Sequence, residues 1–142
     1  MGRSRGGLTT KIHARVDAKG RPLCLLISPG QVHDVSCAEA LLDRLEQCTV
    51  VIADKGYDAE RVRAHIRARG AIPNIPNRSN RISKFRWKKA LYRQRNHVER
   101  FFNKLKQFRR VATRYDKLGA AFLAFVKLAS VRIWLRSIES TA

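Results

Sequence analysis

Acidic residues are scarce in this chain of 142 residues, and they become scarcer along it. There are 11 Asp and Glu against 30 Lys and Arg, which gives a formal net charge of +19. Residues 1–58 hold 7 of the acids and 8 of the bases, so residues 59–142 hold 4 acids and 22 bases. Such an excess implies a polyanionic partner. Because the bases alternate with Phe, Tyr and Trp, a nucleic-acid backbone fits better than a membrane.

Paired cysteines and long apolar runs are also missing. Cys24, Cys37 and Cys48 have no C-x-x-C spacing, so they support neither a zinc motif nor a disulfide framework, and we expect reduced, buried thiols. The most apolar segment, residues 118–126, is too short to cross a bilayer, and no signal peptide is evident. With 44% hydrophobic and 29% charged residues, the composition predicts one globular domain over residues 1–142, without a membrane partner.

The first part of the chain predicts a hairpin and a helix. Two β-rich runs, Thr9–Val16 and Pro22–Ile27, flank a turn at residues 17–20 and predict an antiparallel hairpin, in which the continuously apolar second run is an interior strand. Asp17 is then a solvent-facing turn residue. Apolar residues at helical spacing follow, and Asp34 or Ser36 is placed to cap that helix.

The middle of the chain predicts two returns from helix to strand. A short buried strand at residues 49–53 precedes a helix at residues 59–69, which Asp58 caps and Gly70 closes, and residues 71–75 form another strand. These returns predict an α/β sheet. Residues 76–90 then form a basic loop that we expect to meet DNA. A helix over Tyr92–Lys106, a basic link at residues 109–117 and a terminal helix at residues 118–138 complete the chain.

The segment Tyr92–Lys106 carries a single acid, Glu99, among bases and aromatics. At 100° per residue, the side chains of Tyr92, Arg95, Glu99 and Lys106 fall within an arc of roughly 60°. Ordinary surface pairing of Glu99 with a neighbouring base accounts for this pattern about as well as a functional role, because such pairs are common and each contributes only ~0.2–0.5 kcal/mol.

The spacing of these four residues resembles the signature around the last catalytic acid of DDE transposases from bacterial insertion sequences. Residues 50–58, VVIADKGYD, look like the middle block of that family, an apolar strand that ends in the second catalytic Asp, here Asp54. Residues 2–23 and 28–34 look like the stretches that precede this block in the insertion-sequence branch. The resemblance covers essentially the whole chain.

The resemblance implies a ribonuclease-H-like α/β fold, a mixed sheet flanked by helices, with basic helices at the carboxyl end. It implies that Asp54 and Glu99 are catalytic and bind Mg²⁺ or Mn²⁺, and that DNA strands are cut and joined. DNA contacts are expected from the following residues: Tyr92, Arg95, Lys106, Arg86, Lys88 and Lys89. Core packing is an equal alternative for Tyr92, and Lys55 and Tyr57 either touch DNA or only form a turn. His97 is given no role.

The family's first catalytic Asp lies on a strand upstream of the first matching block, and this sequence begins at Met1 without it. We therefore expect a domain that lacks its first strand and does little or no cutting alone. Expected partners are double-stranded DNA, both transposon ends and target, with either an upstream transposase fragment or further copies of the chain, in the bacterial cytoplasm at the nucleoid. A non-catalytic DNA-binding remnant or inhibitor is the alternative. His33 and Asp34 resemble a metal-binding or acid–base pair, although a helix cap is the favoured interpretation of Asp34.

Overall fold

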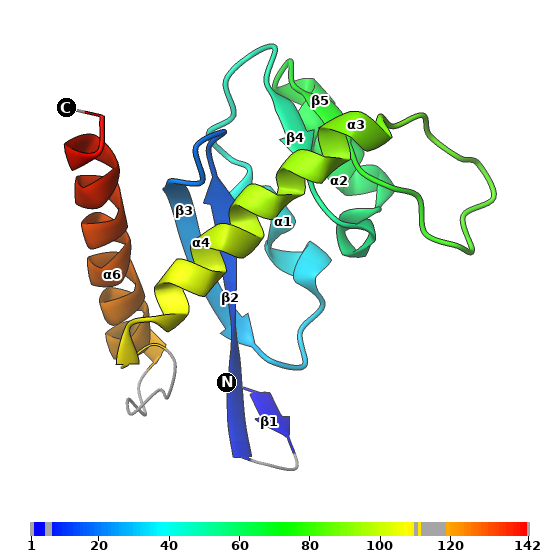
Figure 1. Ribbon diagram of the computed structural model, residues 1–142. Coiled ribbons are helices and arrows are strands. Elements are labelled where there is room, and N and C mark those ends of the chain that lie inside the picture. Colours follow the sequence, from blue (N-terminus) through cyan, green and yellow to red (C-terminus); the bar gives the residue numbers. More distant parts are fainter. Residues whose placement is uncertain (1, 5–6, 110, 112–118, 142) are drawn as a thin grey trace. The chain divides into compact units, whose positions relative to one another are not determined.

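A computed structural model describes residues 2–4, 7–109, 111 and 119–141 of the chain (Figure 1). Backbone contacts divide the chain into two compact units. The hairpin unit comprises Met1–Val32 and Asn96–Ala142, and the loop unit comprises His33–Arg95. Apart from Arg109 and Val111, the predicted basic link at residues 109–117 lies outside the described residues. The expectation of a single domain stays a prediction.

The hairpin unit contains a three-stranded antiparallel sheet in the order β1 (Gly2–Ser4), β2 (Gly7–Val16) and β3 (Pro22–Pro29). The predicted hairpin is confirmed, with Ile12 opposite Ile27. The prediction that the second run is an interior strand is wrong for the described sheet, because β2 is central and Leu23 on β3 is 52% exposed. The reason is β1, whose three residues carry no strand pattern and yet pair with β2.

Asp17 builds the hairpin turn, as predicted, but its side chain is half-buried rather than solvent-facing. Its Oδ1 accepts backbone N–H bonds from Lys19 and Arg21, both at 2.9 Å, and its Oδ2 lies 2.7 Å from the Arg21 Nε. Gly20 supplies the left-handed backbone at φ +77° that the turn requires. Partial burial alone would raise the pKa of Asp17, but the hydrogen bonds from Arg21 and Lys19 outweigh it and hold the pKa below its usual range.

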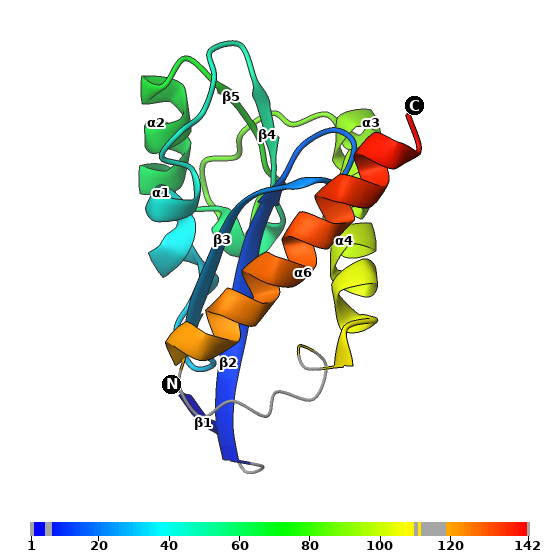
Figure 2. The ribbon, with the colours of Figure 1, turned by 90° about the vertical axis from the view of Figure 1, so that its left-hand side faces the viewer.

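Two helices pack on this hairpin: α4 (Asn96–Lys106) beside β2 and α6 (Gly119–Glu139) beside β3 (Figure 2). The helix expected over Tyr92–Lys106 and the terminal helix are thus both present. The core of the unit consists of buried helical side chains and alternate residues of the two strands. It contains Phe101, Leu105, Val111, Phe122, Val126, Ala129 and Ile133, with Ile12, Ala14, Val16, Leu25 and Ile27 packed against them. The Trp134 indole also donates a 2.7 Å hydrogen bond to the Pro22 carbonyl.

The loop unit contains two short parallel strands, β4 (Val50–Ile52) and β5 (Ile72–Asn74), joined through α2 (Glu60–Ala68). Both strands and the helix were predicted, and Gly70 follows α2 at φ +70°, where a helix C-terminus favours glycine. Further short helical segments are η1 (Asp34–Cys37), α1 (Ala38–Leu41), η2 (Lys55–Tyr57), α3 (Lys89–Tyr92) and η3 (Arg93–Arg95). The core of this unit is made of Ala38, Leu42, Val51, Val62, Ile66, Ala71 and Ile75.

Several local predictions are wrong. Neither Asp34 nor Ser36 caps the helix that follows, since His33 and Cys37 hold the N-cap positions of η1 and α1 and neither makes a side-chain cap hydrogen bond. The thiols are not buried: Cys24 and Cys37 are half-buried, and Cys48 is exposed at φ +61°.

The mixed α/β class is confirmed, whereas the ribonuclease-H-like arrangement stays a prediction. In the described part of the chain, every helix is too short or too polar to span a membrane.

Candidate functional site

The predicted signature segment, Tyr92–Lys106, is helical throughout, but it is not one regular α-helix. The 3₁₀ turn η3 (Arg93–Arg95) separates α3 from α4. Because a 3₁₀ turn advances about 120° per residue instead of 100°, the single arc calculated for the four side chains does not hold across η3. Tyr92 and Arg95 belong to the loop unit, whereas Glu99 and Lys106 belong to the hairpin unit.

Asp54 follows the carboxyl end of β4 and holds the N-cap position of η2. Its Oδ1 accepts the Gly56 N–H at 2.7 Å, the bond by which an Asp turns the chain from a strand into a helical segment. Its Oδ2 lies 3.9 Å from the Arg95 Nη1, and the side chain remains 42% exposed. One carboxylate oxygen of Asp54 therefore fixes the turn, and the other faces a guanidinium at a partly open surface.

A second carboxylate lies near this turn. An added Cβ on Gly56 would meet the Asp54 Oδ1 at 2.8 Å and the Asp34 Oδ2 at 4.0 Å, so Gly56 sits between the two acids. Tyr57 lies beside them. Burial raises the pKa of the Tyr57 hydroxyl above its usual value, and the negative charges of Asp34 and Asp54 raise it further. The Tyr57 side chain therefore stays neutral near physiological pH.

Four residues from separate segments of the loop unit meet at this point. The Arg95 guanidinium lies 5.8 Å from the centre of the Tyr92 ring, within the range of a cation–π contact. Tyr92 in turn makes a T-shaped contact with Trp87, with the ring centres 5.5 Å apart. Trp87, Tyr92, Arg95 and Asp54 thus form a continuous row from aromatic to cation to carboxylate. Such a row places rings that can stack on a base, a cation that can bind a phosphate and a carboxylate that can bind a metal next to one another.

Two pairs of reciprocal hydrogen bonds join the two arms of the basic loop between β5 and α3. Asn77 accepts the Phe85 N–H and donates to the Phe85 carbonyl, both at 2.8 Å. Asn74 accepts the Lys88 N–H at 2.6 Å and donates to the Lys88 carbonyl at 3.1 Å. Each asparagine side chain therefore links the two arms of the loop through a donated and an accepted hydrogen bond.

Asp58 forms a buried ionic centre that the sequence pattern did not predict. The prediction that Asp58 caps α2 is wrong, because Ala59 occupies the N-cap position. The Asp58 carboxylate instead accepts bonds from the Arg63 Nε at 2.9 Å, the Arg81 Nε at 2.8 Å and the Arg78 N–H at 2.7 Å. Burial alone would raise the pKa of Asp58, but the bonds from Arg81, Arg78 and Arg63 outweigh it and lower the pKa below its usual range.

Phe85 fills the space under the same loop. The guanidinium groups of Arg63, Arg81 and Arg67 lie 4.3, 4.8 and 5.1 Å from its ring centre. The Arg81 guanidinium is therefore engaged by the protein itself, and the Arg78 guanidinium donates to the backbone carbonyls of Lys55 and Gly56. Three other cations, Arg86, Lys88 and Lys89, are exposed, and their contact with DNA stays a prediction. The sequence hints at this arrangement only weakly: Phe85 is one of three large apolar side chains, with Ile82 and Trp87, in a basic loop, and nothing in the pattern pairs it with Asp58.

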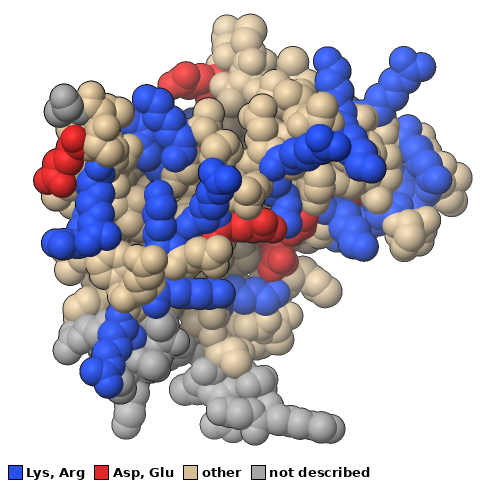
Figure 3. All heavy atoms as spheres, viewed as in Figure 1, with Lys and Arg blue, Asp and Glu red and all other residues tan. Residues whose placement is uncertain are grey.

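Glu99 and Lys106 lie on α4 in the hairpin unit. Glu99 is in the first turn of the helix and exposed, and Lys106 is exposed two turns later, on the same face. Phe101 and Leu105 anchor the opposite face in the core. In the view of Figure 3, Lys and Arg side chains line α4 and surround the loop between β5 and α3, and acidic side chains are few.

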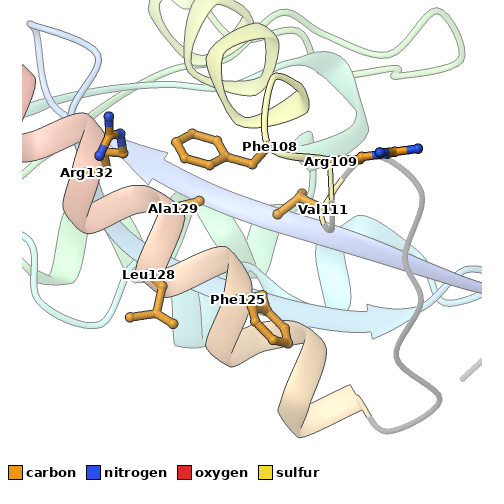
Figure 4. A pocket seen from close by; sticks show the side chains of 7 residues that line it. All are labelled: Phe108, Arg109, Val111, Phe125, Leu128, Ala129 and Arg132. Atoms are coloured by element: carbon orange, nitrogen blue, oxygen red, sulfur yellow. The ribbon is translucent and has the colours of Figure 1, made fainter.

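The hairpin unit also has an apolar cavity of about 340 Å³ between the end of α4 and α6 (Figure 4). Its lining is aliphatic and aromatic except for two arginines: Phe108, Arg109, Val111, Phe125, Leu128, Ala129 and Arg132. The predicted catalytic acids, Asp54 and Glu99, are not among these residues. Among the described residues, no three His, Cys, Asp or Glu side chains are grouped as a metal centre.

The family model of the transposase DDE domain matches residues 2–134. The chain belongs to this family. It is 44% identical over 133 residues to "Putative transposase for insertion sequence element IS6501" of Brucella ovis, which covers 91% of this chain and all of that relative. It is 33% identical over 141 residues to "Putative transposase for insertion sequence element IS402" of Burkholderia cepacia, covering 89% of the chain but 62% of the relative.

A transposase for insertion sequence element IS1106 of Neisseria meningitidis is 40% identical over 57 residues, which is 20% of that protein. This DDE domain thus spans the whole of one relative and less than two thirds of the other two. No solved structure matches it. The resemblance found in the sequence is confirmed at the level of the family.

Proposed function

We propose that this DDE domain acts in DNA transposition, binding the DNA of an insertion sequence and contributing Asp54 and Glu99 to the cutting and joining of its strands. The observation that carries the proposal is the contact between Asp54, at the end of β4, and Arg95 of the signature segment, at 3.9 Å. These residues come from the two sequence blocks that define the resemblance, 41 positions apart. A phosphate placed between Arg95 and the exposed edge of Asp54 would have both a cation and a carboxylate in reach.

The donor set suits a hard divalent cation. Asp54 and Glu99 offer carboxylate oxygens, both at least partly exposed, and Mg²⁺ or Mn²⁺ binds through one or two carboxylates together with phosphate oxygens and water. We propose these two residues as the ligands that this chain supplies. When bound, the metal would supply positive charge beside the attacking and leaving oxygens of an in-line displacement at phosphorus.

The cationic and aromatic residues would bind and orient the DNA. Arg95 holds a phosphate beside Asp54, and Lys106 contacts the backbone from α4. Tyr92, held by its T-shaped contact with Trp87, offers a ring face to an unpaired base. Arg86, Lys88 and Lys89 follow the phosphates from the loop. Strand cutting then has water as the nucleophile and leaves a 3′-hydroxyl, which is the nucleophile for joining.

This chain would act within a larger assembly. Since the domain spans 62% of the Burkholderia relative, a third carboxylate can come from an upstream transposase fragment or from another copy of the chain. We propose that the assembly works on transposon ends and target DNA in the bacterial cytoplasm, at the nucleoid. Without that third ligand, metal affinity falls and the isolated domain cuts DNA poorly.

The test is nicking and strand transfer on labelled transposon-end DNA with Mg²⁺ or Mn²⁺. The chain is assayed alone, with the upstream fragment of a relative, and as Glu99→Gln and Asp54→Asn variants. We expect activity with the fragment and its loss in both variants, whose DNA affinity should be kept or slightly raised because a negative charge is removed. Salt-sensitive binding without cutting in every mixture would favour a non-catalytic DNA-binding remnant or inhibitor instead.

A further inference from the structure

The tip of the basic loop presents an apolar side chain to solvent. Ile82 is 101% exposed, while the next most exposed large hydrophobic of the described chain, Leu128, is 64% exposed. Its neighbours from Arg78 to Lys84 are all polar or basic. A single exposed Ile on an unbraced loop would be ordinary, since apolar atoms form much of any protein surface. The backbone that carries Ile82 makes this case different.

Hydrogen bonds fix the backbone of the loop on either side of Ile82, so its side chain stays exposed. Reciprocal bonds from Asn77 and Asn74 close its two arms, and the Asp58 carboxylate binds the backbone of Arg78 and the side chain of Arg81 on one side of the tip. Residues 71–88 contain no glycine, so the loop has little backbone freedom to fold the tip back. Figure 1 shows the segment between β5 and α3 extending away from the rest of the loop unit.

The positive charge around the tip of the loop favours a nucleic acid as the partner. Lys84, Arg86 and Lys88 are exposed on the same arm of the loop, and Lys89, the first residue of α3, is exposed directly after it. These cations can bind phosphates on either side of an inserted side chain, and proteins that bend duplex DNA insert Ile, Leu, Met or Phe between base steps in this way. A protein partner would need acidic groups facing the cations and a cavity for one Ile. A nucleic acid supplies phosphates and stacked bases in regular alternation.

We propose that Ile82 inserts between stacked base pairs of duplex DNA and opens or kinks the duplex. The proposal rests on the proposed function, because it assigns a role to one residue of the loop that would meet DNA. Partial unstacking carries an energetic cost at the opened step, and the phosphate contacts of the flanking cations together with burial of the Ile side chain offset that cost. Because the loop backbone is already ordered, little additional conformational entropy is lost on insertion.

The test uses the full chain and a duplex with a pyrimidine–purine step, in which 2-aminopurine replaces the adenine. Its fluorescence rises when the base unstacks, and anisotropy of an end label gives the affinity separately. The variants are Ile82→Ser, Ile82→Leu and, as a matched control, Ile72→Ser, which alters an isoleucine that is 57% exposed on β5 of the same unit. Circular dichroism checks that each variant folds.

We expect a fluorescence rise on binding of the wild-type chain, its loss in Ile82→Ser, and its retention in Ile82→Leu and Ile72→Ser. Affinity of Ile82→Ser should fall by roughly tenfold, a change of about 1.4 kcal/mol, with the salt dependence unchanged. Binding by the wild-type chain without a fluorescence rise, or an undiminished rise in Ile82→Ser, would overturn the proposed insertion of Ile82 and leave the proposed function standing. Absence of salt-dependent DNA binding by the wild-type chain would overturn both.

Discussion

At the scale of single residues, Asp58 determines how the loop unit is held together. Its side chain is fully buried and contacts Arg63, also fully buried, and Arg81. Removing one partner of a buried ion pair leaves an uncompensated charge, which typically costs about 3–5 kcal/mol. Asp43 offers a matched comparison, because its pair with Arg69 lies at the surface, where Asp43 is 68% exposed and such pairs are worth roughly 0–1 kcal/mol.

We therefore expect Asp58→Asn to lower the free energy of unfolding of the loop unit by about 3–5 kcal/mol and Asp43→Asn to leave it nearly unchanged. The two tryptophans, Trp87 and Trp134, lie in different units. In a Trp134→Phe background, Trp87 fluorescence during urea unfolding reports on the loop unit alone. Equal effects of the two substitutions would show that the buried ion pair does not stabilise this unit.

The lowered pKa of Asp58 gives the same contact a pH dependence. A carboxylate whose pKa is lower in the folded than in the unfolded chain stabilises the fold above the unfolded value, near 4, and that contribution is lost as pH falls through the folded value. The loop unit should thus keep this stability from neutral pH to about pH 4 and lose it below. Acid titrations followed by Trp87 fluorescence should show a much smaller loss in Asp58→Asn than in the parent chain.

Gly56 controls the position of the Asp54 carboxylate. A Cβ at residue 56 would come within 2.8 Å of the Asp54 Oδ1, the end of a side chain that can rotate away. Gly56→Ala should therefore preserve the fold but displace the carboxylate, and Mn²⁺ affinity measured by calorimetry should fall on the order of tenfold. Gly119→Ala, whose Cβ would meet only the Ile27 Cδ1 at 3.3 Å, is the control. Unchanged Mn²⁺ binding in Gly56→Ala would argue against Asp54 as a ligand.

At the scale of elements, the basic loop depends on its asparagine bonds rather than on apolar packing alone. Asn77→Ala removes both bonds to Phe85, so the loop should open and trypsin should cut within it several-fold faster. Asn80→Ala alters an exposed residue of the same loop and should change the rate little. Cleavage sites and rates are read by mass spectrometry during limited digestion. Identical rates in the two variants would show that the Asn77 bonds do not close the loop.

The elements also show what the sequence alone can predict. The β-rich runs Thr9–Val16 and Pro22–Ile27 identified a hairpin correctly, and Gly70 correctly marked the end of a helix over residues 59–69, because these signals lie within or next to each element. The contacts of Asp58 could not be predicted this way, since its partner Arg81 lies 23 residues further along the chain. Family spacing singled out Asp54 and Arg95, whereas periodicity did not reveal η3, which changes the angle between Tyr92 and the residues after it.

At the scale of the whole molecule, the net charge of +19 attracts any polyanion, so affinity for DNA by itself does not identify the binding surface. The salt dependence of binding does identify the surface, because removing one cation that binds a phosphate makes the slope of log affinity against log salt concentration shallower by about 0.9. Neutralising Arg86, Lys88 and Lys89 together to Gln should therefore reduce the slope by roughly 2–3 and weaken binding to all duplex sequences alike.

The same change of net charge can be made on α6, where Lys127, Arg132 and Arg136 are exposed and were not predicted to contact DNA. Neutralising these three to Gln changes the long-range field equally but removes none of the proposed contacts, so the slope should stay near that of the parent chain. Anisotropy titrations at several salt concentrations measure both triple variants. If their slopes fell equally, DNA would be held by the overall charge, and the loop could not be the surface that positions DNA beside Asp54.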